Sequence, residues 1–169
     1  TGGALDNGAG VIAVVRLADR LRTERLQHRV RVVFFDMEES GLLGSRHHVD
    51  GLDSSRVNAA INVDVVGVGD TVMLGPSHHA GNESIYAAAD NACAALRQRC
   101  MHFPNYATSD DRSFQRAGIP NLSVALLPQL EAHQFWLQLN GGENGGLAPG
   151  FSPATTAMLH TSADSAEAV

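Results

Sequence analysis

The sequence lacks the features that mark several large classes of protein. Its 169 residues include 18 acidic and 12 basic side chains, and no cluster of Lys or Arg forms a basic stripe, so we expect no nucleic-acid partner. No apolar run approaches the roughly 20 residues that a transmembrane helix needs. We find no internal repeat or linker, and 44% of the residues are hydrophobic. These observations predict one globular domain over residues 1–169.

Cysteine is scarce as well, with only Cys93 and Cys100 present. In a continuous helix these two residues would lie about 10 Å apart along the axis, at a rise of ~1.5 Å per residue. That separation is too large for a disulfide unless the helix ends between them. We therefore expect two unpaired thiols, and two cysteines do not identify the redox compartment.

Helix-like and strand-like segments alternate along the chain. The helical spacing of residues 8–26 is followed by a continuous apolar run at 30–36, which is typical of a strand buried on both faces. We expect further strands at 57–66, 71–75 and 119–127, helices at 41–50, 82–99 and 111–117, and a loop at 138–153. This alternation predicts an α/β fold with three layers, αβα, and a mostly parallel or mixed central sheet.

Several acidic residues and one histidine follow these predicted elements. Glu38 and Glu39 come directly after a strand, Asp64 lies near the end of the next one, and Asp6 occupies a turn before the first helix. Ligands bind beyond the carboxyl ends of the strands in such sheets. With His160, these carboxylates are the ingredients of a zinc site. The H-E-x-x-H helix motif is absent, so a metal site would be assembled from separate strand ends.

Five motifs, in this order, resemble those of the M28 family of zinc-dependent exopeptidases: GALDNGAG, VVFFDMEESGLLGSRHHV, NAAINVDVVG, SDDRSFQRAGIP and LHTSADS. The resemblance covers nearly the whole chain. It implies a zinc aminopeptidase that removes residues from the N-termini of peptides or proteins. It also implies a secreted, periplasmic or otherwise exported protein.

The resemblance implies a role for each candidate residue. Asp6 would bridge two zinc ions, Glu39 and His160 would bind one of them, and Asp64 would bind the other. Glu38 would be the general base that takes a proton from a metal-bound water. Adjacent residues leaving a strand point in different directions. One carboxylate of the pair can therefore bind metal while its neighbour faces the water.

The sequence departs from the family pattern in three places. The family's H-x-D motif, which supplies a further histidine ligand, would precede Asp6 and is absent from this chain. We therefore expect an N-terminally truncated fragment that lacks the first strands and holds one zinc through Asp6, Glu39 and His160. Leu159 replaces an aromatic residue that can help to stabilise an oxyanion, and Asp111 stands where relatives often carry a histidine. We assign neither residue a role.

Two alternatives to an aminopeptidase remain open from the sequence. Glutaminyl cyclases resemble this family and use one zinc held by an Asp, a Glu and a His, which matches Asp6, Glu39 and His160. Other relatives keep the fold without catalysis and act as receptors or interaction domains.

The histidines His78 and His79 follow Gly75-Pro76 and are expected in a loop.

Overall fold

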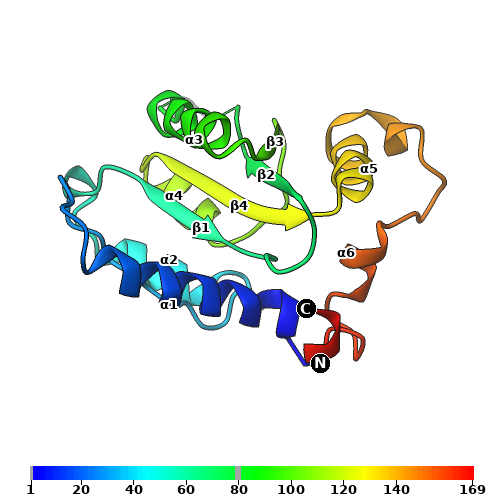
Figure 1. Cartoon of the computed structure of the whole chain (residues 1–169), viewed down its shortest axis with the longest axis horizontal. Coiled ribbons are helices and arrows are strands. Elements are labelled where there is room, and N and C mark those ends of the chain that lie inside the picture. The colour runs from blue at the N-terminus through cyan, green and yellow to red at the C-terminus, as the bar shows by residue number, and fades with distance from the viewer. Residues whose placement is uncertain (1, 79–80) are drawn as a thin grey trace.

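The computed structural model describes residues 2–78 and 81–169, so His79 lies outside the described residues. Helices and strands alternate along most of the chain (Figure 1). The elements are η1 (Ala4–Gly8), α1 (Ala9–Leu21), α2 (Leu43–Asp50), β1 (Ala60–Val63), β2 (Thr71–Gly75), α3 (Glu83–Leu96), β3 (Arg99–His102), α4 (Asp111–Arg116), β4 (Asn121–Leu127), α5 (Gln129–Asn140) and α6 (Ala154–Met158). Short 3₁₀ turns occur at Ser54–Arg56, Glu143–Gly146 and Ala166–Ala168.

The four described strands form one mixed sheet in the order β1-β4-β2-β3. The pairs β1–β4 and β2–β3 are parallel, whereas β2 and β4 are antiparallel. The prediction of an α/β fold with a mixed sheet is therefore confirmed. Because β1 and β4 are parallel, their carboxyl ends lie at the same edge of the sheet, and residues that follow β1 reach that edge.

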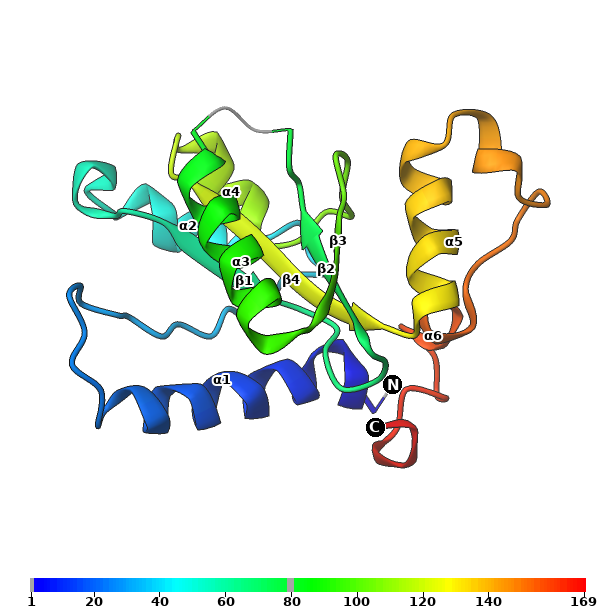
Figure 2. The ribbon, with the colours of Figure 1, turned by 45° about the horizontal axis from the view of Figure 1, so that its top comes forward.

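Helices cover both faces of the sheet, which gives the predicted three layers. Met73, Ala125 and Leu127 pack with Phe103 and the side chains of α5 on one face. Leu74 and Leu122 pack with Tyr86 and other side chains of α3 on the opposite face. The alternation along β2 and β4 follows from the period of two in a strand. Figure 2 shows α3 crossing in front of the sheet.

The prediction of a buried strand at residues 30–36 is wrong. This segment is neither helix nor strand, and Val30, Val32 and Phe34 are exposed. A strand forms only where a neighbour accepts its ladder of hydrogen bonds, and the described partner of β1 is β4 alone. An apolar, β-branched sequence is therefore not sufficient for a strand at this position.

The expectation of two unpaired thiols is also wrong. Helix α3 ends at Leu96, and Arg97 takes a left-handed conformation with φ 52° that reverses the chain into β3. The Cα atoms of Cys93 and Cys100 consequently lie 6.2 Å apart, and the two residues form a disulfide. The sequence allowed a disulfide only if the helix ended between the two cysteines, and the helix does end there.

The segment after β4 contains a helix that the sequence pattern did not predict. Helix α5 covers Gln129–Asn140, so only the start of the predicted 138–153 loop overlaps it. Trp136 donates a hydrogen bond from its indole N–H to the carbonyl of His102 at 3.0 Å, which ties α5 to β3. None of the described helices has the length and apolar character needed to cross a bilayer.

Candidate metal centre

The adjacent glutamates lie on a tight turn that leads into α2. The amides of Gly41 and Leu42 donate hydrogen bonds to the carbonyl of Glu38, at 3.0 and 2.8 Å. The amide of Gly44 donates to the carbonyl of Asp36 at 3.1 Å. A Cβ atom at position 44 would collide with that carbonyl, so the turn requires glycine there. These hydrogen bonds fix the backbone from which Glu38 and its neighbour project.

Three of the predicted site residues meet at one point. The Nε2 atom of His160 lies 2.6 Å from Oε1 of Glu39 and 3.0 Å from Oδ2 of Asp6. One ligand atom from each of the three residues lies within 4.8 Å of the others. Residues far apart in the sequence therefore form a single group of one imidazole and two carboxylates.

Asp64 lies at the end of β1, as predicted, but outside this group of three. Its amide donates to the carbonyl of Val124 at 3.1 Å, which continues the pairing of β1 with β4. Its carboxylate accepts a hydrogen bond from the hydroxyl of Ser109 at 2.8 Å. Burial, followed by the charges of Asp6 and Glu39, raises the pKa of Asp64. Asp64 therefore lies close enough to Asp6 and Glu39 for their charges to raise its pKa. It does not belong to the group of three ligands that includes His160.

Glu38 has the electrostatic environment of a proton acceptor. Burial, with smaller contributions from Asp64, Glu39 and other nearby carboxylates, raises the pKa of Glu38 to about 7. The most effective general base has a pKa near the working pH. The two adjacent glutamates therefore have different surroundings. Glu39 contacts His160, whereas Glu38 has other carboxylates nearby.

Comparison with known proteins identifies the family. The model of peptidase family M28 matches residues 1–169. The chain belongs to peptidase family M28. The whole sequence is covered by that match, which confirms the resemblance drawn from the five motifs.

Several curated relatives of the chain are named aminopeptidases. Leucine aminopeptidase 2 of Trichophyton equinum is 38% identical over 68 residues, which cover 38% of this chain and 14% of the relative. Aminopeptidase YwaD of Bacillus subtilis is 37% identical over 68 residues, or 38% of this chain and 15% of the relative. A probable leucine aminopeptidase 2 of Aspergillus fumigatus is 24% identical over 155 residues, or 85% of this chain and 31% of the relative. The chain spans less than a third of the length of each of these relatives.

Solved structures of aminopeptidases share the fold. A zinc aminopeptidase from Bacillus subtilis superposes with a TM-score of 0.64 at 25% identity, over 73% of this chain and 32% of that one. An aminopeptidase from Aneurinibacillus sp. strain AM-1 gives a TM-score of 0.65 at 25% identity, over 73% and 31%. The mixed sheet with flanking helices is therefore a zinc-aminopeptidase fold.

The donor set of this M28 chain fits zinc. Catalytic zinc sites combine three protein ligands from His, Asp and Glu with one open position. Asp6, Glu39 and His160 supply one nitrogen and two carboxylates. His160 and Glu39 have side chains that are 64% and 63% exposed, whereas that of Asp6 is 18% exposed. Within the group, the side chain of Asp6 is thus mostly buried, whereas those of Glu39 and His160 are accessible to solvent.

Backbone strain in the M28 chain is concentrated around these residues. Among the described residues, five non-glycine residues have positive φ, and four of them either belong to the site or lie within a few residues of one of its members: Met37, Leu42, Val65 and His160. A β-branched residue such as Val65, at φ 56°, is unusual in this region. Strained backbone of this kind is often found at functional sites.

Two residues that sequence reasoning missed support the site. Ser109 binds Asp64 as described, and it precedes the Asp110-Asp111 pair in a motif already quoted. Asp164 accepts hydrogen bonds from the amides of Leu5 and Asp6, at 2.6 and 3.1 Å. Its one sequence signal is its place in LHTSADS, four residues after His160.

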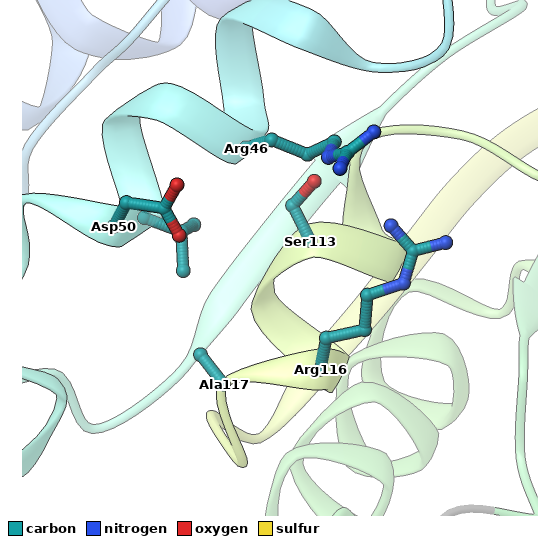
Figure 3. A pocket seen from close by; sticks show the side chains of 6 residues that line it. Arg46, Asp50, Ser113, Arg116 and Ala117 are labelled. Carbon is teal, nitrogen blue, oxygen red and sulfur yellow. The ribbon is translucent and has the colours of Figure 1, made fainter.

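A separate hollow of about 250 Å³ lies between α2 and α4 (Figure 3). Its lining includes both signs of charge, with Arg46 and Arg116 on one side and Asp50 on the other (Figure 3). None of the candidate metal ligands lines it. We therefore assign this hollow no part in the metal chemistry.

Proposed function

We propose that this chain forms part of a zinc-dependent aminopeptidase in which Glu38 is the general base. The observation that carries the proposal is the meeting of Asp6, Glu39 and His160, with the raised pKa of Glu38 beside them. Membership of family M28 and the aminopeptidase names of its relatives support the same reaction.

The residues divide the work of hydrolysis between them. Asp6, Glu39 and His160 would hold zinc, which when bound polarises a carbonyl and makes water more acidic. Glu38 accepts a proton from the attacking water and returns it to the leaving amine. The surrounding carboxylates attract a positively charged α-amine, which favours cleavage at the N-terminus of a peptide.

Asp64 is the candidate ligand for a second zinc. It would share that ion with Asp6, whose charge contributes to the raised pKa of Asp64. Two zinc ions would need further ligands, and within the described residues one group of three ligands is found. We therefore propose one zinc on Asp6, Glu39 and His160 as the tighter site.

The test combines zinc content with the rate of hydrolysis of a leucine anilide. Glu38→Gln should lower the rate by about 10²- to 10⁴-fold and leave zinc content unchanged, because Glu38 is not a ligand. Glu39→Ala should lose the zinc itself. Glu24→Gln, an exposed position beyond α1, is the matched control and should change neither quantity. Full activity in Glu38→Gln would show that the base has been wrongly assigned.

A second candidate function is a single-zinc glutaminyl cyclase. It is favoured by the separation of Asp64 from the group of three, because Asp6, Glu39 and His160 are the ligand types of such a site. Incubation of the zinc-loaded protein with a peptide that begins with glutamine separates the two. Release of ammonia with a blocked N-terminus supports the cyclase, whereas release of free glutamine supports the aminopeptidase.

We also propose that the protein works outside the reducing cytosol. The disulfide between Cys93 and Cys100 supports this, because disulfides persist mainly in oxidising compartments. A titration of thiols in denaturant without reductant should find none. Two reactive thiols in protein taken from its native compartment would contradict the proposal.

A further inference from the structure

The backbone around Asp6 has a gap in its local hydrogen bonding. Asp6 belongs to the short helical segment η1, but its φ and ψ, −115° and 94°, are not helical. The residue before the segment, Gly3, has no side chain that could cap it. The first amides of a helix need partners from outside the helix. The amides of Leu5 and Asp6 therefore need an acceptor from elsewhere in the chain.

Asp164 supplies the missing partners from the other end of the chain. Its Oδ1 accepts from the amide of Leu5 at 2.6 Å, and its Oδ2 accepts from the amide of Asp6 at 3.1 Å. Asp164 is 1% exposed and Leu5 is fully buried. Hydrogen bonds between backbone amides and a carboxylate are stronger than those between neutral groups.

The same two segments are joined a second time by side chains. His160, four residues before Asp164, contacts the carboxylate of Asp6 at 3.0 Å. The backbone of Asp6 is thus held by Asp164 while its side chain meets His160. A Cβ at Gly2 would collide with the carbonyl of Asp164, so the two segments are in close contact.

A buried carboxylate is an unfavourable choice if its only task is to bind two amides, because its desolvation is costly. Its negative charge, however, lies against the backbone of a candidate metal ligand, Asp6. Groups that bind a ligand from behind orient it and increase its basicity, and their loss usually weakens metal binding about 10- to 100-fold.

We propose that Asp164 is a positioning residue for the metal centre, which it acts on by fixing the backbone of Asp6 against His160. The inference rests on the proposed zinc function. Asp164→Asn tests it with little change of shape. The amide can accept through its one oxygen only, and its NH₂ group would face a backbone N–H.

The readouts are zinc affinity, by competition with a chromophoric chelator, and the absorption spectrum of the cobalt-substituted protein. Both are measured well below the melting temperature of each metal-free variant. We expect Asp164→Asn to bind zinc about 10- to 100-fold more weakly, with an altered cobalt spectrum. Asp70→Asn is the matched control. Asp70 also accepts from a backbone amide, that of Gln129 at 3.0 Å, and its loss should reduce stability without changing zinc affinity.

Gly2→Ala gives a second, independent perturbation, because it displaces the backbone at Asp164 and keeps the carboxylate. If Asp164→Asn does not fold, Gly2→Ala decides, and unchanged zinc affinity in that variant overturns the inference. Wild-type affinity and an unchanged cobalt spectrum in folded Asp164→Asn overturn it as well. Failure of the unmodified protein to bind zinc would instead overturn the proposed function, and the inference would fall with it.

Discussion

At the scale of single residues, Asp111 is a buried carboxylate whose ionised form lowers the stability of the folded state. It is 1% exposed, and neither of its side-chain oxygens has a hydrogen-bond partner in the described part of the chain. Burial outweighs the opposing effects of Ser123 and Arg112, which lie nearby without hydrogen bonds of good geometry, and raises the pKa of Asp111 to about 6 from its usual value of 3.8. The folded state therefore binds more protons than the unfolded state between these values, and stability falls as pH rises through this range.

Asp111→Asn should remove this pH-dependent loss. We expect the free energy of unfolding at pH 8 to increase by about 1 to 3 kcal/mol, because the buried charge is gone. The gain should shrink below pH 4, where the wild-type carboxyl is neutral. Denaturant unfolding at the two pH values measures both quantities. Asp19→Asn, on the exposed surface of α1, is the control, and an equal gain in that variant would contradict the explanation.

The site residues that belong to a recognisable sequence motif could be predicted. Motif order indicates all five candidates, Asp6, Glu38, Glu39, Asp64 and His160, and the structure brings three of them into contact. Asp164 could not be predicted, because its role depends on amides 158 and 159 positions away. A hydrogen bond to the backbone leaves no pattern in the side chains that it contacts.

At the scale of elements, the disulfide fastens the end of α3 to β3. Cys93 and Cys100 are separated by seven positions, so the bond closes a short loop. Its loss should lower the free energy of unfolding by roughly 2 to 3 kcal/mol in the chain-entropy model. Denaturant unfolding with and without reductant measures the difference. In the Cys93→Ala/Cys100→Ala variant, reductant should leave the free energy of unfolding unchanged. A change in that variant would show that reductant acts on something other than the disulfide.

Element type could be predicted where the sequence pattern agreed with its neighbours. Strands β1, β2 and β4 lie within their predicted ranges because each has a partner strand. Residues 30–36 carry a stronger strand pattern but gain no partner. Helix α5 was missed because its aromatic residues, Phe135 and Trp136, pack against the core from a segment without clear periodicity. Tertiary contacts therefore override local propensity in both cases.

At the scale of the whole molecule, α1, residues 30–36 and the edge strand β1 expose many apolar side chains. We call this set the apolar patch: Val11, Ile12, Val15, Val30, Val32, Phe34 and Ile61. An apolar hollow of about 230 Å³ lies where the end of α1 meets residues 26–32. Apolar patches of this kind favour association, and an unpaired strand edge adds to the tendency.

We therefore expect the isolated chain to self-associate and to bind a hydrophobic dye. Ile12→Lys with Phe34→Lys should reduce both the average mass in sedimentation and the dye fluorescence, because both substitutions place charge within the patch. Leu130→Lys is the control. Leu130 is 69% exposed and lies on α5, away from this patch. Equal effects of the control and the double variant would show that added charge alone is responsible.

The pairing of Asp6 with His160 and Asp164 also has a consequence for biosynthesis. A growing chain contains both glutamates and Asp64 long before it contains His160, so the three-ligand group cannot form until residues near 160 have left the ribosome. Bringing together positions 158 residues apart is a late event in folding, because long loops close at an entropic cost. Metal capture would then require synthesis to have passed His160, because a polypeptide that ends before this residue would retain most of the carboxylates and still lack the imidazole of the three-ligand group.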